Sequence, residues 1–460
     1  MNCSMEKSQE TSIDNYTDNA LDKKITAKSL FLFSLPSIIG MVFMNLYTMV
    51  DGMFVSRFVG TDALSAINIV FPIIMTVIAI STMLSTGGNA IISKKMGERK
   101  ENEARKDFST IVFISIALSV IISILSFIFI NPLLKFLGAN DSIYNYCFNY
   151  AVISLIFLPA TMFSVVFQTF FITIGKANLG LTFTIIGGIS NVILDYVFIK
   201  VLNFGISGAA IATGIGYSIP GLLGLAYFIF NRKNSLYIVK TKIFNLKLLS
   251  ETCINGSSEM VSSLSASIVT LLFNNILMKL IGVDGVAAVT VILYIQGLLV
   301  AVFMGYSMGC SPLISFNYGK KDNDRLHKIY KLSIIGILVV SILVFMFGLL
   351  KSDLLVSIFT SNGTNVYKLS NIGLKLFSIS FLFMGLNLFT SALFTALSNG
   401  KISAIISFLR TLVFIVISVL VLPLLIGING VWLSVPVSEL LSLIVSIFYL
   451  KKYKSKYKYA

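Results

Sequence analysis

Residues 60–66 read Gly-Thr-Asp-Ala-Leu-Ser-Ala, and residues 282–288 read Gly-Val-Asp-Gly-Val-Ala-Ala. The two stretches lie 222 positions apart, and the alignment continues without a gap from Thr48 and Thr270 to Lys106 and Lys328. Both copies consist mostly of long apolar runs. Many membrane transporters arise from one repeated unit, which gives two lobes around a central site that opens alternately to either side. The repeat therefore predicts two related membrane lobes.

The acidic residues inside the apolar runs are not repeated with the rest of the unit. Asp51 aligns with Phe273, and Glu259 aligns with Ser37. The scaffold is duplicated but its buried charge is not. This asymmetry marks the acids as candidates for function.

Composition indicates a membrane protein. Of the 460 residues, 56% are hydrophobic and 12% charged, with a mean hydropathy of +0.90, whereas a soluble domain carries about 25% charged residues. The alternating pattern of membrane β-barrels is absent. We therefore predict an all-α integral membrane protein with twelve transmembrane helices in two pseudo-symmetric six-helix lobes. The expected spans are residues 30–55, 63–93, 108–130, 143–174, 179–200, 207–230, 253–280, 284–316, 329–350, 367–397, 402–424 and 428–450.

The spans divide the chain into five parts. We expect a cytoplasmic N-terminal tail at 1–28, an N-lobe with spans 1–6 at 29–230, a cytoplasmic linker at 231–250, a C-lobe with spans 7–12 at 251–450, and a basic cytoplasmic tail at 451–460. Six is an even number, so both lobes enter the bilayer from the same side. Their pseudo-two-fold axis should run along the membrane normal, with the cavity between the lobes.

The net charge of +15 is a topology signal and does not indicate nucleic-acid binding. Lys and Arg gather in a few short segments, and a cytoplasmic N-terminus with twelve spans places 27 of the 35 basic residues inside. We therefore expect a multi-pass protein of the cell (plasma) membrane, with both termini cytoplasmic and the lipid bilayer as its surroundings. The main basic segments are 94–106, 232–247, 320–331 and 451–458.

Metal and enzyme sites are not indicated. The four cysteines are scattered, and the single histidine, His327, lies in a basic loop. A zinc site needs several clustered ligands, and a membrane enzyme needs clustered His, Asp or Cys groups beside its spans. We expect no enzyme activity and no cofactor; Na⁺ as a coupling ion would be the only bound metal.

Four polar residues of the N-lobe are expected at one depth. Asp51 and Asp195 each lie about one turn below the outer end of a span, with Asn191 one turn deeper than Asp195 and Thr213 under two turns into the next span. Asn191 and Asp195 are four residues apart and share a helix face. Such oxygens suit a hard cation, and two close carboxylates equally suit a shared proton. The alternative is that the two acids are helix-end residues that reach water.

Three further charged residues fall within spans. A charged side chain is costly to place in the membrane, so each of these residues is a functional candidate by default. Glu259 opens span 7 in a serine-rich stretch, so it either lines the central cavity or caps a helix start. Glu439 lies near the middle of span 12 and is either functional or held by a buried hydrogen bond. Arg410 is either a partner or snorkelling residue or a substrate ligand. Met53 is a further candidate for an adaptable apolar cavity wall.

Three segments resemble a known family when taken together. The stretch Val-Asp-Gly-Met-Phe-Val at 50–55, followed by Gly-Thr-Asp-Ala-Leu at 60–64, is similar to the first-helix signature of the multidrug and toxic compound extrusion (MATE) family. Residues 187–195 resemble its fifth helix, and residues 208–213 its sixth. The resemblance covers about residues 29–449. With Gly-Val-Trp at 430–432, it is greatest to the MepA-like branch of Gram-positive bacteria.

The resemblance implies a multidrug efflux antiporter that exports amphipathic, often cationic small molecules in exchange for H⁺ or Na⁺ by alternating access. The family's N-lobe cation site maps onto Asp51, Asn191, Asp195 and Thr213. NorM-type members carry an acid in span 10, where this chain reads Phe-Thr-Ser-Ala-Leu-Phe-Thr at 389–395, which favours coupling in the N-lobe. The alternative is a flippase for a lipid-linked or narrow endogenous substrate. We expect a monomer.

Overall fold

The computed structural model describes residues 20–241 and 245–460, and over these ranges it is helical and contains no strand. Residues 1–19 of the expected N-terminal tail lie outside the described residues. Twelve helical spans are long and apolar enough to cross a membrane, so the predicted number of spans is confirmed. The first lobe contains α2 (Ala27–Phe58), α3 (Thr61–Gly97), α4 (Glu101–Ile128), α5 (Ile130–Phe136), α6 (Tyr144–Thr173), α7 (Ala177–Asp195), η2 (Tyr196–Val201) and α8 (Gly205–Phe230).

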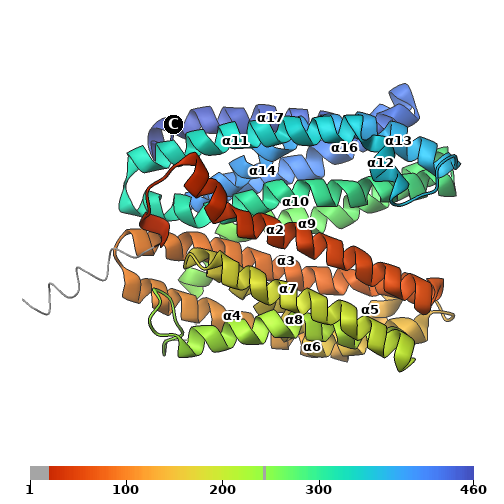
Figure 1. Ribbon diagram of the computed structural model, residues 1–460, viewed down its shortest axis with the longest axis horizontal. Coiled ribbons are helices and arrows are strands. Elements are labelled where there is room, and N and C mark those ends of the chain that lie inside the picture. The colour runs from red at the N-terminus through yellow and green to blue at the C-terminus, as the bar shows by residue number, and fades with distance from the viewer. Residues whose placement is uncertain (1–19, 242–244) are drawn as a thin grey trace, which may run out of the picture.

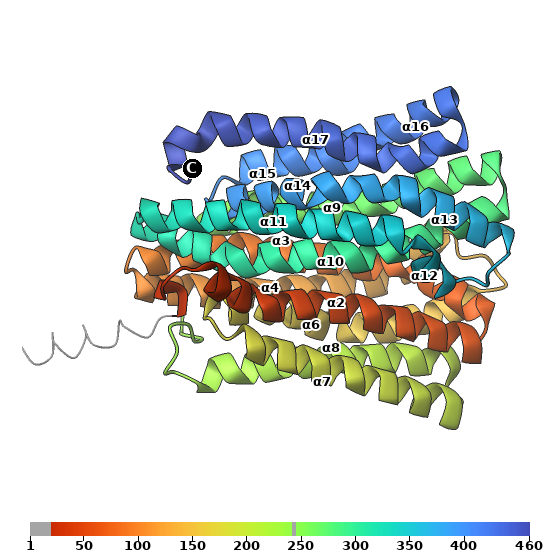
Figure 2. The same cartoon turned by 45° about the horizontal axis from the view of Figure 1, so that its top comes forward.

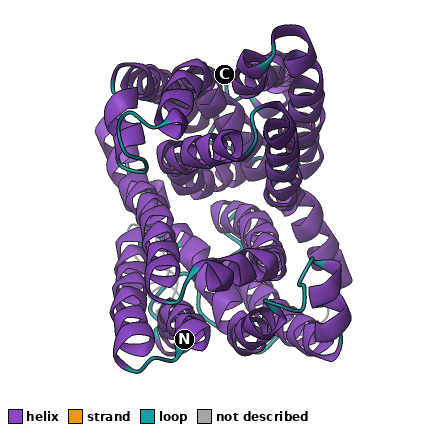
Figure 3. Cartoon of the chain, turned by 90° about the vertical axis from the view of Figure 1, so that its right-hand side faces the viewer, coloured by secondary structure: helices purple, strands orange, loops and turns teal. Residues whose placement is uncertain are grey.

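The second lobe repeats this order. It contains α9 (Leu246–Leu280), α10 (Val283–Lys320), α11 (Asn323–Leu350), α12 (Ser352–Ser357), α13 (Asn365–Phe377), η3 (Ser378–Ser380), α14 (Phe381–Ala396), α15 (Gly400–Phe408), η4 (Leu409–Phe414), α16 (Ile415–Ile426) and α17 (Ile428–Tyr457). The long helices run side by side along the longest axis of the molecule (Figures 1 and 2). Seen from one end, they form two groups (Figure 3).

The contacts between the lobes have two-fold symmetry. Helix α2 of the first lobe packs against α10, and its counterpart α9 packs against α3. A Cβ atom added at Gly97 would lie 2.0 Å from the Phe316 carbonyl oxygen, and one added at Gly319 would lie 2.0 Å from the Lys94 carbonyl oxygen. These four residues are equivalent pairs in the sequence repeat. The predicted pseudo-two-fold relation between the lobes is therefore visible at single residues.

Glycines let the two lobes touch backbone to backbone in one half of the bundle. A Cβ at Gly87 would lie 2.1 Å from the Thr252 carbonyl oxygen, and one at Gly256 would lie 2.0 Å from the Met83 carbonyl oxygen. By contrast, nothing lies within 4 Å of such an atom at Gly52, nearer the opposite end of α2. We call the end where α3, α10 and α17 finish the basic end, because it holds the Lys and Arg segments. The lobes are closed against each other in the half nearest this end.

The N-terminal segment bridges both lobes at the basic end. Asp22 Oδ1 lies 2.7 Å from Lys320 Nζ, Asp22 also pairs with the Arg325 guanidinium, and the Asp22 carbonyl accepts a hydrogen bond of 2.9 Å from Arg325. On the other side, Ala20 packs against Gly175 of the first lobe. We call residues 20–26 the N-terminal strap. This strap reinforces the contact between the lobes.

The linker and the second-lobe boundaries differ from the sequence prediction. Helix α9 begins at Leu246, inside the expected linker, and α17 continues to Tyr457, inside the expected tail. The linker lies against the first lobe, because Arg105 Nε donates to the Ser235 carbonyl at 2.8 Å and the Val239 amide donates to Ser109 Oγ at 2.9 Å. Aromatic contacts between tyrosines one turn apart accompany the extension of α17.

Candidate functional site

The four predicted N-lobe residues come together where α2, α7 and α8 pack. Gly187 makes this approach possible, because a Cβ there would lie 2.4 Å from the Gly216 carbonyl oxygen of α8. Gly188 does the same towards α2, where a Cβ would lie 2.5 Å from the Phe43 ring. The glycine pair thus serves close helix packing. It brings two consecutive spans, α7 and α8, together with the distant α2.

Asp51 and Asp195 form an acidic pair inside the first lobe. Their carboxyl groups lie close enough to act on each other electrostatically. Asp195 is fully buried, and neither of its carboxyl oxygens has a hydrogen-bond donor among the described residues; the same holds for Asp51 Oδ1. Buried carboxyl groups are costly unless they are paired, protonated or bound to a cation. This burial does not fit the alternative in which both acids reach water.

Asn191 and Thr213 complete the cluster one turn away from the acids. Asn191 is buried, its Nδ2 lies 3.5 Å from Thr213 Oγ1, and no donor to its Oδ1 is found in the part of the chain that the structure describes. Both residues line a cavity of about 10 Å³ between α2, α7 and α8. A space of about 10–15 Å³ by this measure holds one water molecule. The cavity therefore has the size of a single small occupant, with unpaired oxygens beside it.

Three tyrosines near the cluster were not predicted. Tyr47 and Tyr217 are neighbours, and both line the same small cavity. Tyr150 of α6 lies near both acids of the pair and is almost fully buried. Tyr47 precedes Asp51 by one turn and Tyr217 follows Thr213 by one turn, so the helical spacing in the sequence could have predicted that these two tyrosines lie near the cluster. Nothing in the sequence placed Tyr150 there.

A helix irregularity follows the acidic pair. The α-helix ends at Asp195 itself, and residues 196–201 continue as one wide π-turn. Such turns within helices occur frequently at functional sites. The same irregularity occurs once more in the described chain, at residues 409–414, and contains Arg410. Both charged positions that the sequence singled out in these spans therefore lie at or next to a π-turn.

Glu439 and Arg410 form a buried ion pair in the second lobe. Arg410 Nε lies 2.9 Å from Glu439 Oε1, and Asn387 Nδ2 donates to Glu439 Oε2 at 2.7 Å. Asn387 is fixed in turn by the Ser446 hydroxyl at 2.9 Å. The structure thus places Glu439 among hydrogen bonds and gives Arg410 an acidic partner. Both charges were predicted from the sequence, whereas Asn387 was not.

Glu259 lies in the middle of its helix and not at a helix start. Because α9 begins at Leu246, Glu259 is about 20 Å from the first residue of the helix at 1.5 Å per residue. It lines a cavity of about 290 Å³ together with Arg410 and Glu439, which we call the second-lobe pocket. The helix-capping interpretation of Glu259 does not fit this position. Met53 lies in α2, but its side chain is outside the described part of the structure, so its role stays a prediction.

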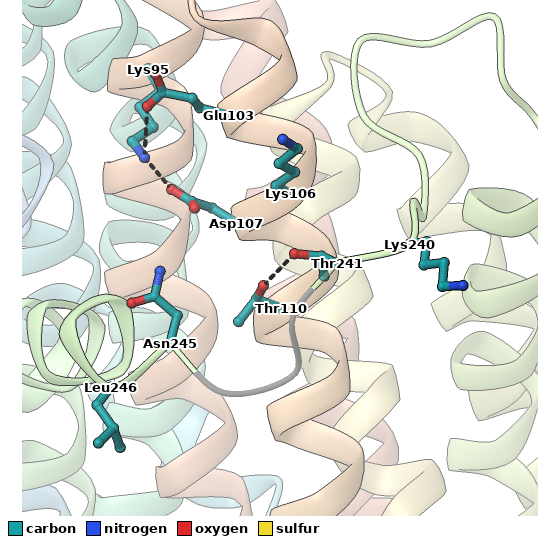
Figure 4. Close-up of a pocket in the computed structure, with 9 residues that line it drawn as sticks. All are labelled: Lys95, Glu103, Lys106, Asp107, Thr110, Lys240, Thr241, Asn245 and Leu246. Carbon is teal, nitrogen blue, oxygen red and sulfur yellow. Dashed lines mark hydrogen bonds and ion pairs between the residues drawn. The ribbon is translucent and has the colours of Figure 1, made fainter.

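A further cavity lies at the basic end, where the linker meets the first lobe (Figure 4). Its wall includes Lys95, whose Nζ lies 3.2 Å from Glu103 Oε2 and 2.6 Å from Asp107 Oδ2, and the hydroxyls of Thr110 and Thr241 are 3.4 Å apart (Figure 4). These contacts join α3, α4 and the linker. They hold the linker in place and lie apart from both polar clusters described above.

Comparison with known proteins agrees with this architecture. The family model described as MatE matches residues 36–197 and 260–420, once in each lobe and over more than half of the chain. The chain is 24% identical over 427 residues to the "Multidrug export protein MepA" of Staphylococcus haemolyticus (strain JCSC1435), which covers 92% of each protein. It is 22% identical over 418 residues to the protein of the same name from Staphylococcus aureus (strain MRSA252), with 91% of this chain and 92% of that protein covered.

Solved structures show the same fold. A structure described as "Crystal structure of MATE in the straight conformation" superposes with a TM-score of 0.89 at 24% identity, over 96% of this chain and 100% of that chain. One described as "Outward-facing conformation of a multidrug resistance MATE family transporter of the MOP superfamily" gives 0.87 at 24% identity, over 96% and 99%.

The two lobes, the twelve spans and the family match define a multi-pass membrane transporter of the efflux class, not an enzyme. The chain belongs to the MatE family. The resemblance stated from its sequence motifs is confirmed, as is the fold that the resemblance implied.

Proposed function

We propose that this transporter is a multidrug antiporter of the plasma membrane, which exports amphipathic cations in exchange for H⁺. The observation that carries the proposal is the acidic pair of Asp51 and Asp195. A shared proton stabilises a buried carboxyl group beside a partly buried one, because two close negative charges in a low dielectric repel strongly. Loss of that proton changes the interaction between α2 and α7. This links ion binding to helix position.

The basic end is assigned to the cytoplasm by the positive-inside bias. The lobes are closed against each other near this end, so the structure corresponds to an outward-facing state in this proposal. Opening of the glycine contacts would then expose the central cleft to the cytoplasm. Alternation between the two states moves a bound molecule outward while protons move inward.

Na⁺ is the second candidate for the coupling ion. The carboxyl oxygens, together with Asn191 Oδ1 and Thr213 Oγ1, offer a set of hard ligands, and none of the described residues donates to Asn191 Oδ1. A flippase function has less support, because an anionic lipid headgroup calls for several basic side chains and Arg410 is the one candidate that the sequence offers within the spans.

Transport in liposomes tests the proposal. The purified protein is reconstituted, and the movement of ethidium is followed under an imposed pH gradient and, separately, under an imposed Na⁺ gradient. We expect ethidium transport under the pH gradient, and its loss in Asp195→Asn and in Asp51→Asn. Transport driven only by Na⁺ would make sodium the coupling ion. Normal pH-driven transport in both variants would refute coupling by the acidic pair.

A further inference from the structure

A groove runs along the outside of the bundle where the two lobes meet. It lies over α10, between α2 of the first lobe and α11 of the second, and these three helices lie side by side (Figure 2). Leu30 and Phe31 form one wall, and Leu332, Gly336 and Val340 form the other. The groove has a volume of about 150 Å³. We call it the seam groove, because each lobe supplies one of its walls.

The seam groove is apolar and opens towards the surrounding membrane. Phe31 is 52% exposed, and Val339, which lies beside the other wall, is 52% exposed as well. Tyr306 is the one polar side chain among the described residues that line the groove, and its hydroxyl already donates to Ser333 Oγ at 2.9 Å. A Cβ added at Gly336 would meet nothing within 4 Å. Such an open slot without free polar groups suits a hydrocarbon chain and not a polar ligand.

Lysines mark one end of the groove. Lys328, Leu332, Gly336 and Val340 follow one another at intervals of four residues, so they form one stripe along α11. The stripe runs from the basic end towards the middle of the bundle over about 18 Å at 1.5 Å per residue, which is close to half of a hydrocarbon core of about 30 Å. On the facing helix, Lys28 lies one turn before Phe31. The groove therefore has the length of one leaflet, with basic residues at the level of the headgroups.

These two lysines are available to bind an anion. Lys28 and Lys328 are exposed, and neither side chain forms an ion pair with a described residue. By contrast, the nearby Lys320 and Arg325 are engaged by Asp22 of the N-terminal strap. Basic residues beside the bilayer attract anionic lipid headgroups. Charge complementarity thus favours a phospholipid with a negative headgroup over a neutral one.

The groove depends on contact between the lobes. Its floor is the packing of α2 on α10, where a Cβ added at Gly305 would lie 2.5 Å from Ile38 Cα and one added at Gly309 would lie 2.8 Å from Ser34 Cα. The two walls belong to different lobes, so they move apart when the lobes separate at the basic end. A molecule that fills the groove binds better to the closed arrangement and stabilises it to that extent.

We infer that an anionic phospholipid of the leaflet at the basic end binds in the seam groove and holds the lobes together there. One acyl chain lies between α2 and α11, and the phosphate lies at Lys28 and Lys328. The inference goes beyond the proposed function, and it does not depend on which ion or substrate the transporter carries. The lipid is a bound stabiliser of one state and is not the exported molecule.

Native mass spectrometry of the purified full-length protein in detergent measures the binding. Dioleoyl phosphatidylglycerol, which is anionic, is compared with dioleoyl phosphatidylcholine, which has the same chains and no net charge. The variant Lys28→Gln/Lys328→Gln removes the two lysines of the groove. Its matched control, Lys401→Gln/Lys451→Gln, removes two exposed lysines elsewhere on the second lobe. Gly336→Phe fills the groove, whereas Gly336→Ala adds only one methyl group to it.

The wild type should bind phosphatidylglycerol more tightly than phosphatidylcholine. In Lys28→Gln/Lys328→Gln, the Kd of phosphatidylglycerol should rise roughly 30-fold, because each basic residue beside the bilayer contributes a factor of about five to the affinity. The Kd of phosphatidylcholine should change little. Gly336→Phe should weaken the binding of both lipids, and Gly336→Ala and the lysine control should resemble the wild type.

Three results would overturn the inference. The first is equal affinity of the wild type for the two lipids, or an unchanged Kd of phosphatidylglycerol in Lys28→Gln/Lys328→Gln. The second is unchanged binding in Gly336→Phe, which would exclude the groove as the place of the chain. The third is displacement of the lipid by glycerol phosphate, which has no chains and would show a site for the headgroup alone.

Spin labels at the basic end, one in each lobe, test the effect of the lipid on the lobes. In vesicles that contain phosphatidylglycerol, Lys28→Gln/Lys328→Gln should populate the open arrangement more than the wild type does. In vesicles of phosphatidylcholine alone, the two proteins should give the same distances. The same distances in both kinds of vesicle would refute the claim that the lipid holds the lobes together. Neither measurement uses an ion gradient, so the failure of this inference is distinguishable from failure of the proposed antiport.

Discussion

Substitution of Gly256 by alanine should open the closed half of the transporter. The built Cβ lies 2.0 Å from the Met83 carbonyl oxygen, whereas ordinary van der Waals contact begins near 3.4 Å. The backbones of α9 and α3 must therefore separate by about 1.4 Å, and packing strain of this kind costs about 1–3 kcal/mol. That cost applies only while the lobes touch. It corresponds to a shift of roughly 5- to 150-fold in the equilibrium towards the state that is open at the basic end.

Distances between spin labels at the basic end, one in each lobe, measure this shift in the reconstituted protein. The fold should not suffer, because alanine is a better helix former than glycine by about 1 kcal/mol in a helix interior. Gly336→Ala is the matched control, since nothing lies within 4 Å of a Cβ there and its helix α11 also spans the membrane. If Gly256→Ala and Gly336→Ala gave the same distance distribution as the wild type, the assigned contact between the lobes would be refuted.

Three further variants test separate parts of the account. With a gradient of one pH unit, one proton per cycle supplies about 1.36 kcal/mol, which limits dye accumulation to about tenfold, and Asp195→Asn should abolish this accumulation. The thermal stability of the variant should be equal or higher, since a buried acid that no described residue donates to is replaced by a neutral side chain. Accumulation at the wild-type level would count against the acidic pair. Asp22→Asn should loosen the N-terminal strap and raise the amide exchange rate of residues 20–26 several-fold, in keeping with the modest strength of partly exposed ion pairs; unchanged exchange would show that the pairing with Lys320 does not hold the strap. Asn387→Ala should destabilise the protein by about 1–3 kcal/mol in thermal unfolding, because a carboxylate oxygen of the buried ion pair loses its donor; an unchanged melting temperature would contradict that role.

The spans could be predicted from the sequence because a membrane-spanning helix must be apolar over a length that matches the thickness of the bilayer. The repeat predicted the relation between the lobes. The positions of helix ends were harder to predict. Residues 246–252 precede the apolar run of α9 with mixed polarity, so hydropathy missed them, although the Asn245 side chain caps the helix by accepting from the Leu248 amide. Residues 451–457 are rich in Lys and Tyr and were taken for a tail. Their tyrosine contacts depend on helical geometry.

The candidate site was predictable where its members share helical spacing or depth. Asp51, Asn191, Asp195 and Thr213 have a common depth, and the structure brings them together. Glu439 and Arg410 were each recognised as costly charges, but their pairing was not, because they are 29 positions apart on different helices. An interaction of this kind is set by helix packing, which the sequence of one chain does not reveal.

Proton release measures the central claim most directly. Ethidium is added to the purified protein in a weakly buffered detergent solution, and the pH change is followed with an indicator dye. If the acidic pair holds the exchanged proton, the wild type releases about one proton per bound ethidium, and the double variant Asp51→Asn/Asp195→Asn releases none while remaining folded. Release of the same size from the double variant, or ethidium binding to the wild type without release, would contradict the account.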